Sequence, residues 1–154
     1  RSLLDSDVII QPHAPNIFDQ FNDYQFAGAD EMPHYGNLCE SDWWKKEVAA
    51  FYKSQGIEFM PTRGVNAGVM LFNDTPTMCD IYSEPSNPYP KLWCVEQFWL
   101  WYNLEKVNWK PIDQKWNWAY IRADFFKHIK EAYFIHFNGI KDISERVKIM
   151  RESM

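Results

Sequence analysis

Short apolar runs alternate along the chain with stretches whose apolar residues recur every three or four positions. Continuous runs of a few apolar residues indicate strands, and the longer periodic stretches indicate helices. On this basis we expect strands at residues 3–10, 67–72, 107–112 and 133–137. We expect helices at residues 42–55, 75–82 and 95–103, a single helical turn near 17–21, and a C-terminal helix that begins at Asp142 or Ser144.

Residues that start and stop helices support these boundaries. Ser41 or Asp42 can cap the helix at 42–55, and Gly56 can end it. The segments 11–35 and 84–90 contain several prolines, so we expect loops there. Strands that alternate with helices indicate an α/β fold, in which helices cover the faces of a sheet.

The composition limits the class of protein. At 154 residues the chain has the length of one domain, residues 1–154, and its 46% hydrophobic and 24% charged residues are typical of a globular protein. No apolar run approaches the ~20 residues of a membrane-spanning helix, so we expect no membrane span. The net charge is −5 and the Lys and Arg residues are scattered, which argues against nucleic acid as a partner.

The three cysteines favour a reducing compartment. Cys39, Cys79 and Cys94 form no C-x-x-C pair and have no spacing typical of a zinc site. We therefore expect buried, reduced thiols, and the predicted location leans towards the cytoplasm.

Aromatic residues make up 18% of the chain and include eight tryptophans. Most of them should lie in the core, because these side chains bury the largest area. The remainder would suit a sugar or another ring-shaped ligand, since aromatic faces stack against such partners. The composition therefore permits carbohydrate chemistry.

Two carboxylates interrupt the first expected strand. Asp5 and Asp7 flank Ser6 between the apolar residues 3–4 and 8–10. A carboxylate on a buried strand is unfavourable unless it has a partner. Mg²⁺ or Mn²⁺ would be such a partner, because these cations prefer carboxylate oxygens and leave positions open for phosphate. The alternative is a turn in which the aspartates bond their own backbone.

Four further segments place polar residues beside apolar runs. Residues 65–73 read V-N-A-G-V-M-L-F-N, residues 96–97 read E-Q, residues 115–117 read K-W-N, and residues 133–139 read Y-F-I-H-F-N-G. Their order and spacing resemble those of the GT-A glycosyltransferases, closest to the glycogenin and galactosyltransferase-like group, family 8. That family has a D-x-D, an N-[SA]-G-[VM] segment, a D-Q pair, a W-N pair and an H-[FY]-x-G in this order. The resemblance covers nearly the whole chain.

This resemblance implies a metal site. Asp5 and Asp7 would hold Mn²⁺ or Mg²⁺, and His136 would be the third protein ligand. Two carboxylates and one imidazole leave about three octahedral positions for water and phosphate oxygens. The metal would then act as a Lewis acid on the departing diphosphate. Without the D-x-D, His136 would be interpreted as an ordinary strand-end or core histidine.

The resemblance also implies catalytic and substrate-binding residues. Glu96 and Gln97 stand where the family has D-Q, beside the reacting sugar carbon, with Glu96 in place of the usual aspartate. A solvated glutamate favoured by the helix dipole is the alternative for Glu96. The expected contacts with the substrates come from the remaining motif residues: Asn66, Ala67, Gly68, Trp116, Asn117, Gly139 and Lys141. The family usually follows H-[FY]-x-G with a Lys-Pro-Trp that touches the diphosphate, whereas Lys141 comes one residue earlier and is followed by Asp142. For Asn66 the alternative role is a cap at the strand entry.

The function implied is that of a metal-dependent hexosyltransferase that retains configuration at the anomeric carbon. It would move a sugar from a nucleotide-diphosphate sugar donor to a carbohydrate or other hydroxyl acceptor. The expected fold is GT-A, a Rossmann-like mixed sheet flanked by helices. The family's strands that grip the nucleobase and ribose precede the D-x-D, so we expect residues 1–154 to be a fragment of the catalytic domain without these N-terminal strands.

Two other functions remain open at this point. A non-catalytic carbohydrate-binding domain would use the surplus of Trp and Tyr, and its D-S-D would be a structural turn or a Ca²⁺ site. A metal-dependent phosphoesterase would require more His and Asp ligands than the chain supplies, since its histidines are His13, His34, His128 and His136.

Overall fold

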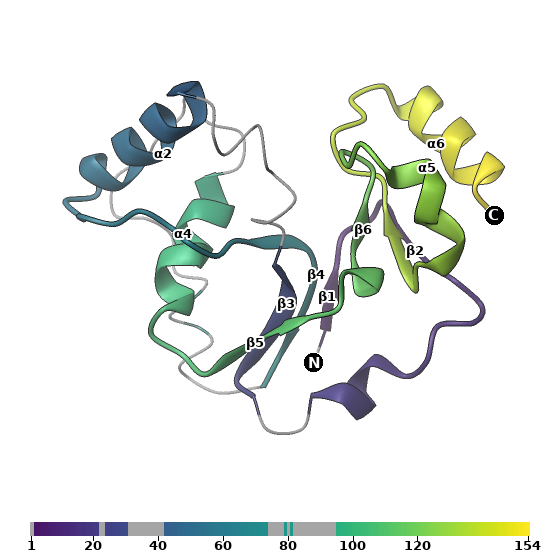
Figure 1. Cartoon of the computed structure of the whole chain (residues 1–154), viewed down its shortest axis with the longest axis horizontal. Helices are drawn as coiled ribbons and strands as arrows, with labels where there is room; N and C mark the ends of the chain where they lie inside the picture. The colour runs from purple at the N-terminus through teal and green to yellow at the C-terminus, as the bar shows by residue number, and fades with distance from the viewer. Residues whose placement is uncertain (1, 22–23, 31–41, 74–78, 80, 82–94) are drawn as a thin grey trace.

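The computed structural model of the chain describes residues 2–21, 24–30, 42–73, 79, 81 and 95–154. Within these residues, strands form two mixed sheets with helices packed on their outer sides (Figure 1). The strands are β1 (Ser2–Leu4), β2 (Val8–Ile10), β3 (Phe26–Asp30), β4 (Val65–Phe72), β5 (Trp109–Ile112), β6 (Trp118–Ala119) and β7 (Phe134–His136). The α-helices are α2 (Asp42–Ser54), α4 (Val95–Leu104), α5 (Phe125–His128) and α6 (Ile143–Glu152), and the 3-10 helices are η1 (Ile17–Gln20), η3 (Gln114–Trp116) and η4 (Ile129–Glu131). The chain is therefore an α/β protein, as the pattern of its sequence predicts.

The larger sheet has the strand order β1-β4-β3-β5. β4 pairs antiparallel with both β1 and β3, and β5 is a parallel edge strand beside β3. Residues of β4 alternate between the two faces of this sheet, as they must in any strand. Met70 packs with Leu100 and Leu104 of α4, whereas Val69 and Leu71 pack with residues that come from the second sheet and η3.

The smaller sheet has the strand order β2-β7-β6. β7 pairs antiparallel with β2 and parallel with β6. Phe125 of α5 and Ile135 and Phe137 of the β7 segment are buried together, and Ile149 and Met150 of α6 pack against them. α5 and α6 thus cover this sheet on the side away from the larger one (Figure 1).

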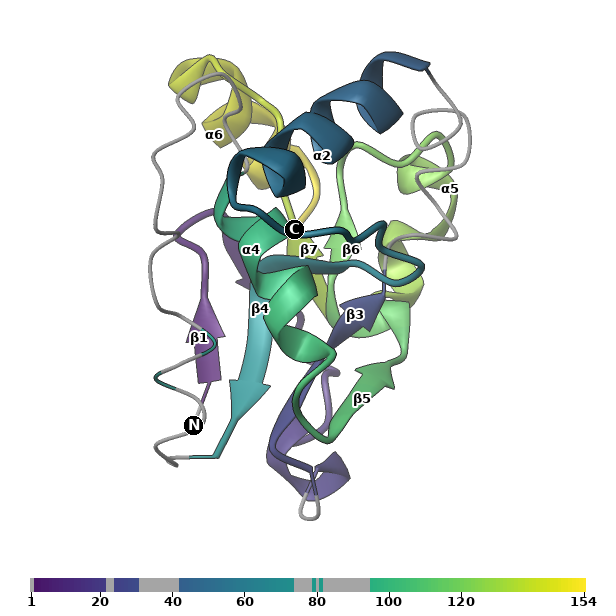
Figure 2. The same cartoon turned by 90° about the vertical axis from the view of Figure 1, so that its left-hand side faces the viewer.

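An aromatic cluster attaches α2 to the outer side of the larger sheet. Val48, Phe51 and Tyr52 of α2 are buried against Phe98 and Trp101 of α4. Seen from this side, α2 and α4 lie in front of β4 (Figure 2). The apolar residues that recur at helical spacing in α2 therefore lie on the face that is buried in the core, as the sequence predicts.

The expectation of a single buried strand at residues 3–10 is wrong. β1 and β2 belong to different sheets, each is an edge strand, and Leu3 and Leu4 are exposed. The Val8 N–H donates to the Asp5 carbonyl at 3.2 Å, so the chain makes a turn between them. The residues of D-S-D favour turns, and here that preference overrides the apolar run.

The loop expected at residues 11–35 contains a strand instead. β3 lies at the centre of the larger sheet, although Ala27, Gly28 and Ala29 have low strand propensity. A Cβ atom added to Gly28 would collide with Cγ1 of Val65, so close packing requires the small residue. Tertiary contact, which local sequence does not report, therefore decides this strand. The strand β6 and the helix α5 were likewise not expected.

Most other expected elements are confirmed with shifted ends. β4 begins two residues before the expected strand, and β5 accommodates Pro111 because it lies at a sheet edge. Gly56 follows α2 with φ of 71°, the left-handed conformation that ends helices. The Asp142 side chain accepts a hydrogen bond from the Glu145 N–H and caps α6.

Several expectations lie wholly or largely outside the described residues. They are the helix at 75–82, the loop at 84–90, the Ser41 cap, Cys39 and Cys94. Cys79 is exposed, so the expectation of a buried thiol is wrong for this residue.

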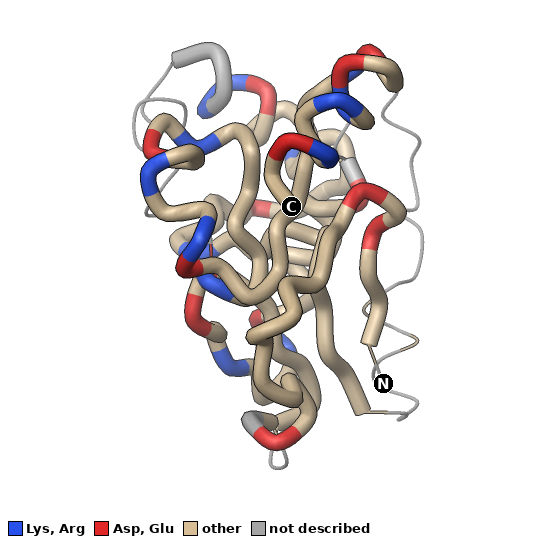
Figure 3. Tube along the Cα trace, turned by 90° about the vertical axis from the view of Figure 1, so that its right-hand side faces the viewer, with Lys and Arg blue, Asp and Glu red and all other residues tan. Residues whose placement is uncertain are grey.

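No helix in the described ranges is long and apolar enough to cross a lipid bilayer. Acidic and basic positions are interspersed along the trace (Figure 3).

Candidate metal centre

The turn between β1 and β2 connects the two sheets. The Asp5 N–H donates to the Gly68 carbonyl of β4 at 3.0 Å, which ties one end of the turn to the larger sheet. The Asp7 carbonyl accepts from the Phe137 N–H at 3.0 Å, which ties the other end to the smaller sheet. The backbone of the turn is therefore held from both sides, and this places its two carboxylates over the junction of the sheets.

His136, the last residue of β7, lies opposite this turn. Its Nε2 is 3.3 Å from Asp7 Oδ1 and 3.6 Å from Asp5 Oδ2. One ligand atom from each of the three residues lies within 4.8 Å of the others. The structure thus brings together the three side chains that the sequence proposes as metal ligands, although they come from opposite parts of the chain.

A chain of buried amides sets the protonation of the His136 ring. The Asn66 side-chain oxygen accepts from the Gly68 N–H at 2.8 Å and from Asn117 Nδ2 at 3.1 Å. Asn117 therefore presents its oxygen to His136 Nδ1, 3.1 Å away, and that nitrogen must carry the proton. Nε2 faces the two aspartates. With a proton on Nε2 the ring donates to Asp7, and a cation that binds here would take the place of that proton and use the Nε2 lone pair. This arrangement of a ligating histidine with an orienting partner on its other nitrogen is common at metal sites.

Gly68 provides the space for the imidazole. A Cβ atom at this position would lie 2.8 Å from His136 Nε2 and closer still to two other ring atoms. Real side chains do not approach that closely, so any larger residue would displace the ring. The requirement explains why a glycine stands within this buried strand.

The cluster is buried on one side and open on the other. The side chain of His136 is 4% exposed, that of Asp7 14% and that of Asp5 47%. Burial raises the pKa of Asp5, and the neighbouring Asp7 carboxylate adds to this effect. The hydrogen bond with His136 lowers the pKa of Asp7, and the Arg146 guanidinium lowers it further. Three donors that converge below an open face leave room for the water or phosphate oxygens that a hard cation requires.

Arg146 contacts the cluster from α6. Its Nη1 is 3.2 Å from Asp7 Oδ2. No sequence motif marks Arg146, because an arginine in an amphipathic helix is ordinary. Only the packing of α6 on the smaller sheet brings it to the turn.

Glu96 and Gln97 lie in the first turn of α4, which Gln97 joins to β4. Burial of its carboxyl group raises the pKa of Glu96, and the charge of Asp5 adds to this effect. The Gln97 side-chain oxygen accepts from the Ala67 N–H at 3.0 Å, so Gln97 fixes β4 beside the cluster. Only the NH₂ group of Gln97 remains to donate to another molecule.

The other expected substrate-binding residues divide into two groups. Asn66 and Asn117 are buried beneath the cluster, where their amides support His136. Trp116 is also buried, and it packs against Tyr133 and Phe134 in the core. In this structure these three side chains contact other residues of the chain, and their expected contacts with a substrate stay a prediction. Gly139 takes a positive φ of 79° in the turn after β7, and Lys141 is exposed.

Comparison with protein-family models, with curated proteins and with solved structures gives no match to this chain. The two carboxylates suit the hard cations Mn²⁺ and Mg²⁺, and the imidazole nitrogen favours Mn²⁺ of the two, because Mg²⁺ prefers oxygen ligands.

Proposed function

We propose that the chain carries the metal-binding part of a GT-A glycosyltransferase that transfers a sugar from a nucleotide-diphosphate donor to a hydroxyl acceptor. The observation that carries the proposal is the convergence of Asp5, Asp7 and His136 within 4.8 Å at the junction of two sheets. The resemblance names as ligands two aspartates and a histidine that are far apart in the sequence. These three side chains meet in the structure, although the packing of an α/β fold does not by itself require this.

The donor set supports Mn²⁺ or Mg²⁺ as the cation. Bound there, the cation would neutralise the charge that develops on the departing diphosphate. The chain's own residues hold and orient this position. Asn117 fixes the ring of His136, the two backbone hydrogen bonds of the turn fix the aspartates, and the exposed side of Asp5 leaves access for phosphate oxygens.

Glu96 and Gln97 are the proposed residues next to the sugar. Both lie in the first turn of α4, and the charge of Asp5 acts on Glu96. The NH₂ group of Gln97 can donate to a sugar hydroxyl or to the leaving oxygen while its carbonyl oxygen stays bound to Ala67. Such a donor stabilises charge only while the glycosidic bond breaks, and is therefore expected to affect turnover more than binding.

The tryptophans argue against the alternative of a carbohydrate-binding domain. Trp99, Trp101, Trp109, Trp116 and Trp118 are the ones whose side chains the structure describes, and all five are buried or half-buried. Within this part of the chain the tryptophans pack in or against the core, and none of these five is exposed as a platform on which a sugar ring could stack.

The decisive experiment measures thermal unfolding of the protein produced from the natural reading frame that contains this chain. Nucleoside diphosphates should raise the melting temperature only when Mn²⁺ or Mg²⁺ is present, because a ligand that binds the folded state stabilises it by mass action. Asp7→Asn should abolish the metal-dependent part, and Asp124→Asn, which alters an aspartate of the loop before α5, should keep it. Equal stabilisation with and without metal would contradict the proposal.

A further inference from the structure

The two oxygens of the Asp7 carboxylate face different partners. Oδ1 is 3.3 Å from His136 Nε2, on the side of the candidate metal position. Oδ2 is 3.2 Å from Nη1 of Arg146, on the side of α6. A carboxylate that gives one oxygen to a guanidinium has one oxygen left for a cation.

Arg146 is held firmly in this position. Its Nε donates to the Ile140 carbonyl at 3.0 Å, and its Nη2 donates to the same oxygen. The guanidinium group is planar and presents its N–H groups in a fixed fork. Arg146 therefore cannot release Asp7 Oδ2 by a simple rotation without also losing the hydrogen bonds to Ile140.

The number of oxygens that Asp7 can offer bears on which cation fits. Ca²⁺ takes six to eight oxygen ligands and readily uses both oxygens of one carboxylate, whereas Mg²⁺ demands a compact octahedron. We propose that Arg146 is a specificity-determining residue that restricts Asp7 to a single ligand oxygen and so biases the site towards Mn²⁺ and Mg²⁺ over Ca²⁺. This inference rests on the metal site of the proposed function.

Charge repulsion from Arg146 cannot produce the same preference. The guanidinium would repel any divalent cation at this position to a similar extent, because the charges and distances are nearly the same. A ratio of two dissociation constants removes this common effect. The ratio of the Ca²⁺ constant to the Mn²⁺ constant therefore reports the ligand geometry.

The test compares Arg146→Gln and Arg146→Lys with the unaltered protein. Mn²⁺ binding is followed by the paramagnetic resonance signal of the free ion, and Ca²⁺ binding by its competition with Mn²⁺. Loss of an orienting partner at metal sites changes affinity roughly 10- to 100-fold. We expect the ratio to fall by about tenfold in Arg146→Gln, because Mn²⁺ binding weakens while the freed oxygen compensates for Ca²⁺. The ratio should also fall in Arg146→Lys, because a flexible ammonium lacks the fork that binds Ile140 and Asp7 together.

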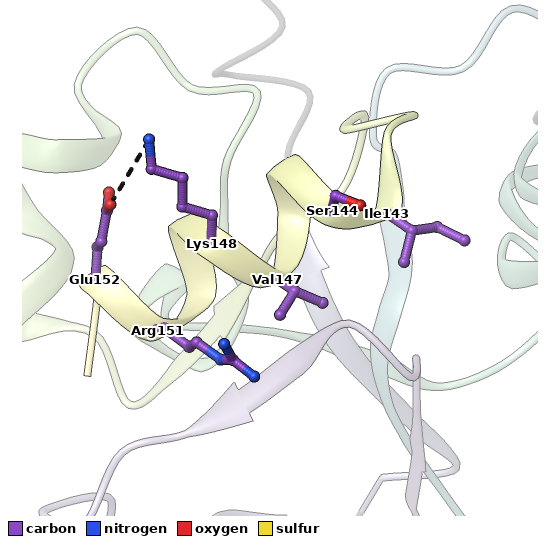
Figure 4. Close-up of a pocket in the computed structure, with 6 residues that line it drawn as sticks. All are labelled: Ile143, Ser144, Val147, Lys148, Arg151 and Glu152. Carbon is purple, nitrogen blue, oxygen red and sulfur yellow. Dashed lines mark ion pairs between the residues drawn. The ribbon is translucent and has the colours of Figure 1, made fainter.

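Arg151→Gln is the matched control. This arginine belongs to the same helix but lines the pocket along the outer side of α6, with Ile143, Val147 and the Lys148–Glu152 ion pair (Figure 4). The substitution Arg151→Gln removes one positive charge from α6 and does not alter a residue that contacts the turn. The ratio of the Ca²⁺ to the Mn²⁺ dissociation constant in this variant should equal that of the unaltered protein. Because both constants are measured on the same sample, partial unfolding of a variant does not alter the ratio.

The possible failures are separable. If the unaltered protein binds no Mn²⁺, the proposed function and this inference both fall. If it binds Mn²⁺ and the ratio in Arg146→Gln stays within about twofold of the original, only the role of Arg146 is refuted. A ratio that falls in Arg146→Gln but not in Arg146→Lys would show that the guanidinium fork is not what restricts Asp7, and would likewise overturn the inference.

Discussion

Replacing Gly68 with alanine adds one methyl group at the most crowded point of the cluster. The new Cβ would lie 2.8 Å from His136 Nε2 and nearer to two other ring atoms, below any normal van der Waals contact. The ring cannot move away freely. Asn117 holds Nδ1 of the His136 ring. The backbone carbonyl of His136 accepts a hydrogen bond from the Tyr120 N–H at 2.8 Å. Either the ring or strand β4 must therefore shift.

Two effects follow, and their sizes can be estimated. Overpacking of a well-packed interior typically costs about 1–3 kcal/mol. At roughly 2–4 °C per kcal/mol for a chain of this length, Gly68→Ala should lower the melting temperature by about 2–12 °C. Displacement of His136 should also weaken Mn²⁺ binding roughly 10- to 100-fold, the usual effect of disturbing the orientation of a ligand.

Gly28→Ala separates these two effects. Its added Cβ would collide with Val65 in the packing between β3 and β4, so the stability cost should be similar. No ligand of the cluster is displaced, so Mn²⁺ affinity should stay unchanged. Calorimetric melting and Mn²⁺ titration of both variants provide the comparison. The reasoning would be refuted if Gly68→Ala bound Mn²⁺ like the parent, or if Gly28→Ala lost as much affinity.

Two further predictions concern Gln97 and Tyr52. Gln97→Ala should lower kcat about 100-fold with little change in KM, and Gln97→Glu, which keeps the acceptor for Ala67 but has no donor, should do the same. Near-parental kcat in both variants, measured by release of nucleoside diphosphate, would make Gln97 a structural residue only. Burial raises the pKa of Tyr52 well above its usual value, and its hydroxyl donates to the Phe98 carbonyl at 2.7 Å. The folded state therefore keeps this proton to higher pH than the unfolded chain does, so the stability it contributes is fully present below about pH 10 and declines above it. Denaturant unfolding should find Tyr52→Phe about 1 kcal/mol less stable at neutral pH, and this difference should vanish near pH 11; a constant difference would count against the assignment.

The sequence predicts the cluster better than it predicts the strands that build it. Asp5 and Asp7 can be selected because two carboxylates between apolar runs suit a hard cation, and His136 can be selected because the resemblance to family 8 adds an H-[FY]-x-G to the D-x-D. The expectation that the aspartates interrupt one buried strand is wrong, since they form a turn between edge strands. The ligands could be named without the correct strand because the order of the motifs, and not the secondary structure, marks them.

The supporting residues could not be predicted in the same way. Asn117 contacts His136 because β6 pairs with β7, and β6 consists of only two residues, too few for any periodic pattern. Arg146 reaches Asp7 because of how α6 packs, and a helical pattern gives only the face of a residue, not its distant partner. β3 was missed because its small residues are chosen by close contact with β4, whereas local propensity argues against a strand.

The turn at Asp5–Asp7 has a mechanical consequence. One end is fastened to β4 of the larger sheet and the other to the Phe137 backbone beside the smaller one. The spacing of the carboxylates therefore depends on how far apart the two sheets lie. That separation is set by the core in which Trp116 and Phe134 pack against Val69 and Leu71. A change in the volume of these buried side chains would alter the spacing of the carboxylates without touching either one, so selection on the cluster also acts on residues deep in the core.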